Sequence, residues 1–430
     1  MIWLYRLLFL PALILAMPYY GFRMLRRGGY AKDFSHRFGG HKDLPAPADG
    51  KKRIWLQAVS VGELEAIAVL VDTFEKAGDI ELVITTTTST GYKILREKYA
   101  SKCVYVGIFP IDFWPFSSRS WDKIKPDFCI LMEGELWPEH LHQAKVRGKK
   151  AILLNARMSD RSFSRYVRIR YFARRLFDKF AAICASSEFD ASRLISLGAS
   201  TLKVFCTGNI KFDSKPSKIL DETERAALRA ELGFSPDSLV ILGSSTWQGE
   251  EEMLVGAMLA ARARGIDCRL LIVPRHAERR EQIKPVISAY KHCVRSERKQ
   301  AEDDTLIYLA DTTGELRMLA QAADLAFVGK SLPPHMGGQT PIDCAALKIP
   351  MVYGPHMTNF RRACETLERD GASVKVPDAA SAVEELARLA ANPLLRCTIA
   401  EKAKDWHNSN VGATERSYDI IRDVIDSVRA

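Results

Sequence analysis

Short apolar segments alternate with longer amphipathic segments along most of the chain, and they do so in two separate sets. The short apolar runs are typical of fully buried strands, and the amphipathic stretches between them are typical of helices. This alternation predicts an α/β fold with two parallel sheets, each covered by helices on both faces. The expected strands are 54–59, 82–86, 103–106, 128–132, 151–154 and 182–185, followed by 239–243, 270–273, 307–309, 325–328 and 351–353.

A polar stretch that contains a proline separates the two sets of strands, at residues 211–218. The chain has 430 residues, of which 47% are hydrophobic and 27% charged, so it is long enough for two domains of about 200 residues each. We therefore expect a first Rossmann-like domain at 22–212, a linker at 213–220 and a second Rossmann-like domain at 221–412. The last helix, at 413–430, is expected to pack back on the first domain.

Residues 1–21 are apolar apart from Arg6, and basic residues follow them. A cleaved signal peptide carries its basic residues ahead of the apolar run and ends in a small-residue cleavage site, so this order favours an uncleaved membrane anchor. About twenty apolar residues can just span a bilayer, although Pro11 would kink the helix and Arg6 would have to reach the interface. The basic flank predicts that the rest of the chain lies on the cytoplasmic face.

The charge and cysteine content narrow the possible partners and compartments. The formal net charge of +10 suits an anionic partner such as phosphorylated lipid, nucleotide or nucleic acid, without choosing among them. Residues 165–179 interleave cations with aromatic side chains and are either a membrane-surface or acceptor-phosphate patch or an ordinary solvated helix. The nine cysteines include no C-x-x-C pair, which favours reduced thiols in a cytosolic compartment.

Glu63 directly follows a glycine turn at the end of the first predicted strand. In open α/β sheets such strand-to-helix corners lie at the carboxyl ends of the strands, where ligands bind. A carboxylate at this corner can accept a proton from a substrate hydroxyl as a general base. On this segment alone, a purely structural role in the first turn of the helix is the more frequent explanation.

Three further polar corners follow strands of the first half. Glu133 and Glu135 come after the strand at 128–132, Arg157 follows the next strand, and Lys211 lies at the end of the domain. The carboxyl ends of neighbouring parallel strands meet at one edge of a sheet, so we expect these side chains to converge on one crevice. Taken singly, each of them has a structural explanation, such as an ion pair between Glu133 and Arg157.

The second half carries corners suited to a phosphate and a sugar. The segment 243–251 is a strand, a loop of small residues and a helix start, whose free N–H groups can hold an anion. Arg275 provides a cation after the strand at 270–273, and Asp343 lies in the first turn of a helix after a flexible Gly337-Gly338 loop. Both are also compatible with ordinary surface roles. The sequence has no Walker motif, no D-x-D and no H-E-x-x-H, so no metal is expected.

In combination and in order, these segments resemble the 3-deoxy-D-manno-octulosonic acid (Kdo) transferases that act on the lipid A precursor. The resemblance runs nearly end to end. It is carried by Ser60-Val-Gly-Glu63, Glu133-Gly-Glu-Leu-Trp-Pro138, Asn155-Ala-Arg157, Lys211 within 208–213, Pro274-Arg275-His276, Gly314-Glu315-Leu316, Phe327-Val-Gly329, Gly337-Gly338, Gly354-Pro-His356 and Asn359-Phe360.

The resemblance implies an inverting, metal-independent glycosyltransferase of lipopolysaccharide core biosynthesis. Its fold would be of the GT-B type, with two Rossmann-like domains whose parallel sheets face a central cleft, and with an N-terminal membrane-anchor helix. The implied donor is CMP-Kdo, and the implied acceptor is a lipid A precursor such as lipid IVA. The implied location is the cytoplasmic face of the bacterial inner membrane, against its anionic surface, with no cofactor, no metal and no nucleic-acid partner.

The resemblance also implies roles for individual residues. Glu63 would be the general base, and Glu133 and Lys211 would assist the transition state. The positions that match the family's CMP-binding residues are Pro274, Arg275, Gly314, Glu315, Leu316, Thr340, Pro341, Ile342 and Asp343.

Three segments depart from the family's pattern. The usual G-G-H-N-P-L-E is Gly337-Gly-Gln-Thr-Pro-Ile-Asp343 here, the usual T-H-E-G-E-E is Thr246-Trp-Gln-Gly-Glu-Glu251, and the usual E-T-E is Glu133-Gly-Glu135. Because two of these changes fall in the donor half, they leave two alternatives open. One is a GT-B transferase with another nucleotide-sugar donor, and the other is a non-catalytic membrane-bound binder of a sugar lipid or nucleotide.

Overall fold

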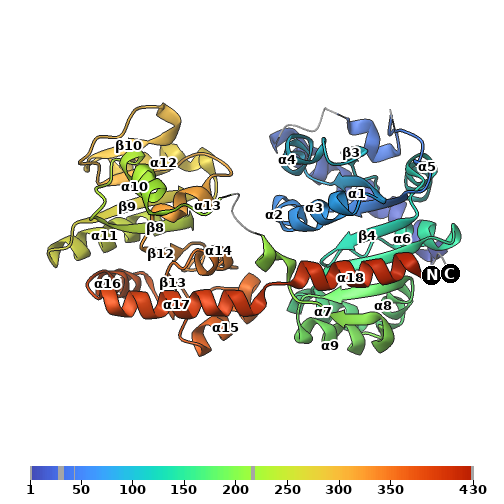
Figure 1. The fold of residues 1–430 in the computed structure, drawn as a ribbon. Helices are drawn as coiled ribbons and strands as arrows, with labels where there is room; N and C mark the ends of the chain where they lie inside the picture. Colours follow the sequence, from blue (N-terminus) through green and yellow to red (C-terminus); the bar gives the residue numbers. More distant parts are fainter. Residues whose placement is uncertain (1, 28–32, 43, 215–217, 428–430) are drawn as a thin grey trace. The chain divides into compact units, whose positions relative to one another are not determined.

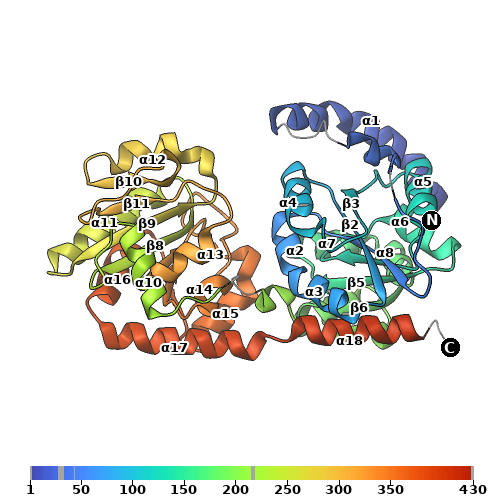
Figure 2. The ribbon, with the colours of Figure 1, turned by 45° about the horizontal axis from the view of Figure 1, so that its top comes forward.

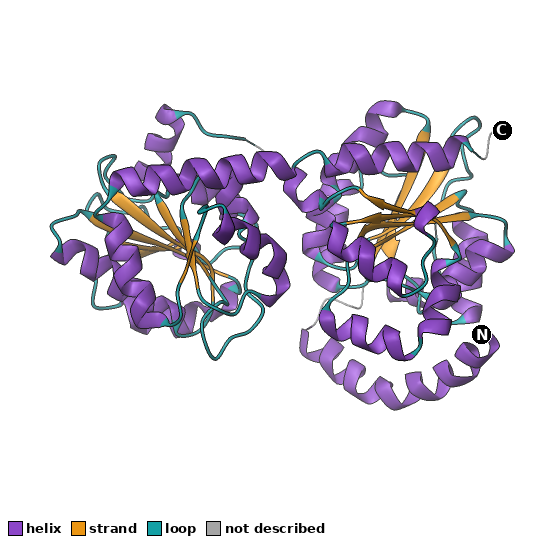
Figure 3. Cartoon of the chain, turned by 90° about the horizontal axis from the view of Figure 1, so that it is seen from below, coloured by secondary structure: helices purple, strands orange, loops and turns teal. Residues whose placement is uncertain are grey.

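The computed structural model describes residues 2–27, 33–42, 44–214 and 218–427. The chain forms two compact units, shown in Figure 1: unit 1 comprises Met1–Ser214 and Val411–Ala430, and unit 2 comprises Lys215–Asn410. Each unit is built around a seven-stranded sheet. Helices lie on both faces of each sheet (Figure 3), and the α/β architecture with two parallel sheets is therefore confirmed.

The sheet of unit 1 has the strand order β3-β2-β1-β4-β5-β6-β7, and all neighbouring strands are parallel. Successive side chains of a strand point to opposite faces, so Ile54 and Leu56 enter one core of the unit and Trp55 enters the other. Both faces of the central strands are thus buried. The strands are β1 Lys52–Gln57, β2 Ile80–Thr86, β3 Tyr105–Ile108, β4 Phe128–Met132, β5 Lys150–Ala156, β6 Phe180–Ala185 and β7 Val204–Cys206.

Two layers of helices cover this sheet. One core contains Phe74 and Ile421 from helices on one face, and the other contains Trp121 and Phe177 from helices on the opposite face. The helices of unit 1 are α1 Ile2–Arg27, α2 Val61–Ala66, α3 Ala68–Ala77, α4 Ser89–Tyr99, α5 Trp114–Ile124, α6 Pro138–Val146, α7 Asp160–Arg168, α8 Arg170–Phe177, α9 Glu188–Ser196 and α18 Ala413–Asp426.

The sheet of unit 2 has the order β10-β11-β9-β8-β12-β13-β14, again with parallel neighbours. Its strands are β8 Leu239–Thr246, β9 Cys268–Pro274, β10 His292–Val294, β11 Ile307–Leu309, β12 Leu325–Val328, β13 Met351–Tyr353 and β14 Val374–Lys375. Its helices are α10 Glu222–Glu231, α11 Glu250–Ala263, α12 Arg280–Ile287, α13 Leu316–Leu319, α14 Ile342–Ala346, α15 Arg361–Arg369, α16 Ala379–Ala390 and α17 Pro393–Asn410.

Short elements complete both units. The edge strands β7, β10 and β14 have only three, three and two residues, and the apolar pattern did not predict them. The 3-10 helices are η1 Phe34–Phe38, η2 Thr201–Lys203, η3 Ile210–Asp213, η4 Ala277–Arg279, η5 Arg295–Glu297, η6 Ala320–Ala322 and η7 Thr358–Phe360.

The N-terminal helix α1 lies along unit 1, as Figure 2 shows. It has 26 residues and contains Pro11 and Pro18. Its segment Ile2–Phe22 is long and apolar enough to cross a membrane. Length and composition alone do not distinguish a spanning helix from one that lies in the membrane interface.

The C-terminal helix α18 packs on unit 1 and is fixed at its start by Asp213. The Asp213 carboxylate accepts hydrogen bonds from the backbone N–H of Gly412, at 2.6 Å, and from that of Thr414. These N–H groups belong to the first turn of a helix, where the backbone has no partner of its own. Ile421 and Ile425 of α18 are fully buried in the core that also contains Phe74. The end of the chain therefore completes unit 1.

Replacing Asp213 by Ala should loosen α18, because the N–H groups of Gly412 and Thr414 lose their acceptor. We expect a loss of about 1–2 kcal/mol of local stability, visible as faster hydrogen–deuterium exchange of the α18 amides. Asp378→Ala is a matched control, since Asp378 caps α16 in unit 2 through Ser381. Unchanged exchange of α18 in the Asp213 variant would refute this account.

Candidate active site

Each sheet has one place where the order of its strands reverses. In unit 1 the chain proceeds outward from β1 to β3 and then returns to β4 beside β1, and in unit 2 it returns to β12 beside β8. The connections that leave two such neighbours turn in opposite directions and open a crevice at the carboxyl ends of the strands. These two points are where ligands are expected in each unit.

Glu63 lies in the first turn of α2, after β1 and hence at the reversal point of unit 1. The Glu63 Oε1 atom accepts a hydrogen bond from the Ser60 hydroxyl at 2.9 Å, and Oε2 accepts one from the Val59 N–H at 2.9 Å. The Ser60 hydroxyl in turn accepts from the Glu63 N–H at 3.3 Å. Glu63 therefore has the helix-capping contacts of the structural explanation, and these contacts also hold its carboxylate in one orientation.

Glu133 lies directly after β4, on the other side of the same reversal point. Its backbone is left-handed, with φ 53°, and its N–H bonds to the Leu154 carbonyl at 2.9 Å. Lys211 Nζ lies 2.6 Å from Glu133 Oε1, whereas Arg157 Nη1 lies 3.9 Å from the same oxygen. Lys211 is thus the closer partner of Glu133, and the pairing with Arg157 that the sequence allowed is the weaker contact.

Asn155 places Lys211 beside Glu133. Asn155 is fully buried at the end of β5 with a left-handed backbone, φ 52°. Its Oδ1 atom accepts the N–H of Ile210 at 3.2 Å, which fixes η3 against the sheet. The corners after β1, β4 and β5 and the segment η3 therefore converge within unit 1.

The carboxylates at this point influence one another. Burial raises the pKa of Glu63, and the nearby charge of Glu133 adds to this effect. The hydrogen bonds from Val59 and Ser60 and the charge of Lys211 act in the opposite direction without cancelling it. Glu63 therefore holds a proton more readily than an exposed glutamate does.

Glu135 belongs to the same group, as its place after the strand at 128–132 predicted, although no catalytic or binding role was predicted for it. Burial raises the pKa of Glu135 to about 7, with further contributions from the charges of Glu63 and Glu133. The available signal was the spacing of Glu133 and Glu135, two residues apart after a strand. The pattern does not reveal this burial, because it depends on side chains that only the fold brings together.

In unit 2, Pro274 ends β9, and Arg275 follows it with an exposed side chain. The Arg275 N–H bonds to the Thr246 carbonyl at 3.2 Å, which ties this corner to the end of β8. In the described part of the chain, no hydrogen bond or ion pair joins the Arg275 side chain to the other predicted donor-binding residues. Arg275 is therefore an exposed cation beside the central strands.

Gly314, Glu315 and Leu316 form the turn that begins α13. Gly314 has φ 92°, a conformation that glycine adopts without strain. The Glu315 carboxylate is held by Arg295 at 2.9 and 2.7 Å, and this guanidinium lowers the pKa of Glu315. The carboxylate of Glu315 thus has an internal ion-pair partner, whereas the backbone of the turn remains the part suited to contact a ligand.

Asp343 lies in the first turn of the short helix α14, which begins after Thr340 and Pro341. The Thr340 hydroxyl accepts the N–H of Ile342 at 3.2 Å, and Asp343 Oδ1 is 2.8 Å from Arg317 Nε. Arg317 directly follows Leu316, so this ion pair brings the start of α13 and the start of α14 together. Two of the three predicted donor-binding segments therefore meet in unit 2.

Glu250 organises the reversal point of unit 2, a role the sequence analysis did not predict. Its carboxylate is only 1% exposed and accepts the N–H groups of Trp247 at 2.8 Å, Lys330 at 2.9 Å and Ser331 at 3.1 Å. Burial raises the pKa of Glu250, and these backbone hydrogen bonds oppose the rise. One carboxylate thus connects the loop after β8 to the loop after β12.

Trp247 stands where the resembling family has histidine. Lys330 Nζ lies 4.5 Å from the centre of the Trp247 ring, and the rings of His276 and His335 lie 5.4 and 5.5 Å from it. The ammonium above the ring is a cation–π contact. The residue that departs from the family pattern is therefore packed within a cationic and imidazole cluster next to the central strands.

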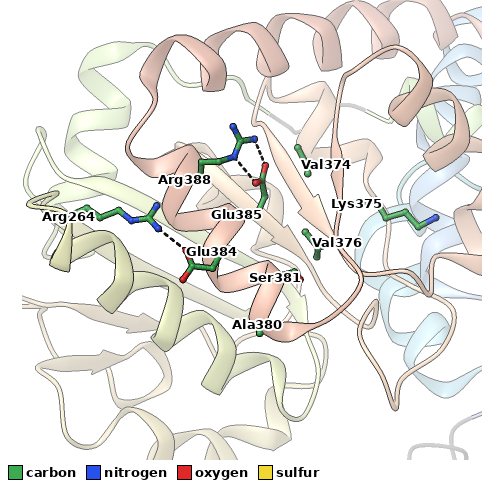
Figure 4. A pocket seen from close by; sticks show the side chains of 9 residues that line it. All are labelled: Arg264, Val374, Lys375, Val376, Ala380, Ser381, Glu384, Glu385 and Arg388. Carbon is green, nitrogen blue, oxygen red and sulfur yellow. Dashed lines mark hydrogen bonds and ion pairs between the residues drawn. The ribbon is translucent and has the colours of Figure 1, made fainter.

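A further surface pocket in unit 2 does not coincide with any predicted residue. It lies between α11, β14 and α16, as shown in Figure 4. Arg264 pairs with Glu384 at 2.8 Å and Arg388 with Glu385 at 2.6 Å, so its charged groups neutralise one another. The pocket is lined by Arg264, Val374, Lys375, Val376, Ala380, Ser381, Glu384, Glu385 and Arg388.

Comparison with solved structures defines the class of the fold. The UDP-N-acetylglucosamine 2-epimerase of Neisseria meningitidis, bound to UDP-GlcNAc, matches 87% of this chain over the whole of its own length, with a TM-score of 0.60 and 14% identity. This likeness concerns the fold alone. Two parallel α/β units of this kind, combined with such a neighbour, define a GT-B-type fold.

Comparison with sequences defines the family. Residues 32–214 match the family model of 3-deoxy-D-manno-octulosonic-acid transferase. The 3-deoxy-D-manno-octulosonic acid transferase of Bordetella pertussis is 30% identical over 93% of this chain and 94% of its own length, and that of Haemophilus influenzae is 28% identical over 98% and 99%. The chain belongs to the Kdo transferases, which are glycosyltransferases, and the resemblance found in the sequence is confirmed.

The raised pKa of Glu135 predicts how the stability of the protein depends on pH. The folded state holds the proton up to about pH 7, whereas an unfolded glutamate releases it near 4.5, so stability is lost as the pH rises between these values. Between pH 5 and 8 the free energy of unfolding should fall less in Glu135→Gln than in the wild type, by about 1–3 kcal/mol. Denaturant unfolding at pH 5 and at pH 8 measures this fall in both proteins. The same fall in the variant as in the wild type would contradict a raised pKa of Glu135.

Proposed function

We propose that the protein is an inverting, metal-independent transferase that moves Kdo from CMP-Kdo to a lipid A precursor such as lipid IVA, in lipopolysaccharide core synthesis. In this proposal unit 1 binds the acceptor and supplies the base, and unit 2 binds the donor. The observation that carries the proposal is the position of Glu63 beside the Glu133–Lys211 ion pair at the reversal point of unit 1.

Glu63 is the proposed general base. The acceptor hydroxyl attacks the anomeric carbon of Kdo, its proton passes to the Glu63 carboxylate, and the bond between that carbon and the phosphate oxygen of CMP breaks. Attack opposite the leaving group inverts the configuration and requires only one base. A raised pKa strengthens a carboxylate as a proton acceptor, and the contacts from Ser60 and Val59 fix its orientation.

Glu133 and Lys211 are proposed to assist the transition state. The ring acquires positive charge as the leaving group departs, and the carboxylate of Glu133 can stabilise it. The ammonium of Lys211, 2.6 Å from Glu133, can also reach an anionic group of a substrate. The two side chains thus supply both signs of charge beside the base.

The donor is proposed to bind three segments of unit 2. They are Pro274-Arg275, the turn Gly314-Glu315-Leu316, and the helix start Thr340-Pro341-Ile342-Asp343. Arg275 is an exposed cation suited to a phosphate, and the backbone of the two turns is suited to the nucleotide. The Asp343 carboxylate accepts one hydrogen bond from Arg317. A carboxylate has further lone pairs, and these can accept a hydrogen bond from a ribose hydroxyl.

A different nucleotide-sugar donor is the second candidate, and the Trp247 cluster is the observation that favours it. A bulky ring with Lys330 above it occupies the place of a family histidine next to the central strands. Incubation with CMP-Kdo and with UDP-sugars in parallel separates the two candidates. Transfer from a UDP-sugar alone would replace CMP-Kdo by this second donor.

The location proposed for this reaction is the cytoplasmic face of the bacterial inner membrane. The apolar segment Ile2–Phe22 supports membrane attachment, and the net charge of +10 suits an anionic lipid surface. A lipid acceptor in that leaflet would be supplied by diffusion within the membrane. The nucleotide donor would come from the cytoplasm.

The reaction is tested by mass spectrometry of a tetra-acylated, bis-phosphorylated lipid A precursor after incubation with the protein and CMP-Kdo generated in situ. A gain of one or more Kdo masses supports the proposal and counts the additions. EDTA added after the CMP-Kdo has formed tests metal independence, since loss of transfer from intact CMP-Kdo would show that a metal is needed. An unmodified lipid in the presence of intact CMP-Kdo would overturn the proposal.

Replacing Glu63 by Gln removes the proposed base and should lower the transfer rate by about 10²–10⁴-fold. Glu65→Gln is the matched control, because it makes the same chemical change two residues further along α2. The control should retain near-normal transfer. Equal and near-normal rates in the two variants would exclude Glu63 as the base. Absence of transfer in the wild type and in both variants would favour the non-catalytic alternative.

A further inference from the structure

The first turns of α1 are attached to the folded body of unit 1 by partly buried polar contacts. Arg6 makes two hydrogen bonds to the Glu139 carboxylate, from Nε and Nη2, each 2.8 Å long, and the Glu139 side chain is completely buried. The Tyr5 hydroxyl donates to Asp112 Oδ2 at 2.8 Å. A two-point Arg–carboxylate pair of this kind fixes both position and orientation.

The acceptors of these bonds are themselves part of the fold. Asp112 is 2% exposed and accepts the backbone N–H groups of Glu139 and His140 at 3.0 and 2.8 Å, so it caps the start of α6. Hydrogen bonds from Arg6 and Gln143 keep the pKa of Glu139 low against the effect of its burial. Arg6 is therefore the counter-charge of a buried carboxylate of the domain.

One stripe of α1 contacts the rest of unit 1 in the first turns of the helix. The stacking of Phe9 on Phe113, with ring centres 5.7 Å apart, continues the contact beyond Arg6. The half-buried positions recur at intervals of three or four residues, as expected for one side of a helix lying on a surface. Between Ile2 and Ala16 these positions are Ile2, Tyr5, Arg6, Phe9, Leu13 and Ala16.

The opposite side of α1 is apolar and exposed. Trp3, Leu7 and Leu15 are 71%, 71% and 83% exposed, and further large apolar side chains flank them. An exposed apolar surface of this extent indicates an interaction with a membrane or another protein. The charged residues Arg23, Arg26 and Arg27 follow directly in the sequence, and the chain has a net charge of +10, which favours a surface of anionic lipid.

These contacts conflict with a helix that crosses the bilayer. The helix rises about 24 Å along its axis between Arg6 and Phe22. In a transmembrane orientation the first turn would lie on the far side of the membrane from the domain that the helix anchors. Tyr5 and Arg6 instead contact that domain, and Figure 2 shows α1 lying along it.

We infer that α1 lies in the plane of the membrane interface as a monotopic anchor. The Arg6–Glu139 pair and the half-buried stripe hold it on unit 1, and the exposed apolar stripe faces the acyl chains of an anionic leaflet. The inference rests on the membrane attachment proposed above and adds its geometry. It places the N-terminus and the body of unit 1 on the same side of the membrane.

Epitope accessibility tests this arrangement in the full-length protein. One epitope is added at the N-terminus and another at the C-terminus, after α18 of unit 1. Both should be cleaved by protease in inverted membrane vesicles and protected in spheroplasts. Protection of the N-terminal epitope in inverted vesicles, with cleavage in spheroplasts, would show a transmembrane helix and overturn the inference.

The same preparation is assayed for Kdo transfer, so that the two proposals fail separately. Inactive protein with both epitopes on the cytoplasmic side would refute the proposed reaction and support the interfacial helix. Protein that forms a dimer through α1 and does not float with vesicles of phosphatidylglycerol and phosphatidylethanolamine would show that a second copy covers the apolar stripe, and would also overturn the inference.

Variants of the ion pair test the attachment itself. In Arg6→Ala, hydrogen–deuterium exchange of residues 2–9 in lipid nanodiscs should rise at least tenfold, because the first turns lose their hold on unit 1. The charge exchange Arg6→Glu with Glu139→Arg should restore part of the protection. Arg96→Ala, which removes a cation from the ring of Tyr92 on α4, is the control. In a spanning helix the loss of Arg6 would leave the exchange unchanged.

Discussion

The parallel pairing of strands is the constraint on which the rest of this structure depends. Parallel strands need crossover helices, the helices cover both faces, and every strand then points its carboxyl end to the same edge of its sheet. The reversal of strand order places two of these ends side by side in each unit. Glu63 and Glu133 occupy that place in unit 1, and the loops connected by Glu250 occupy it in unit 2.

The short segment η3 connects the candidate site of unit 1 to the end of the chain. Lys211 pairs with Glu133, and Asp213, two residues later, caps α18. Asn155 fixes the start of this segment by accepting the backbone N–H of Ile210. A C-terminal helix that packs on the first unit thus also stabilises the position of a lysine in the site. This coupling connects residues 411–427 to the candidate site, whose residues lie far away in the sequence.

The sequence predicted the sheets and the corners better than it predicted the contacts. Long apolar runs such as 128–132 identified the central strands, because burial on both faces leaves a continuous signal. The edge strands of two or three residues leave no such signal. The ion pair of Arg6 could not be predicted from the sequence, because its partner Glu139 lies 133 residues away and only the fold brings the two together. The same holds for the burial that shifts the pKa of Glu135.

The carboxylates at the candidate site of unit 1 are arranged at a cost in stability. Glu63, Glu133 and Glu135 lie near one another, and Lys211 forms its ion pair with Glu133. Neighbouring desolvated carboxylates raise one another's pKa and destabilise the folded state. A fold optimised for stability alone would not place them close together. Such local conflicts are expected at functional sites. Burial and the charge of Glu133 raise the pKa of Glu63, and two hydrogen bonds orient its carboxylate, which supports the general-base role proposed for it.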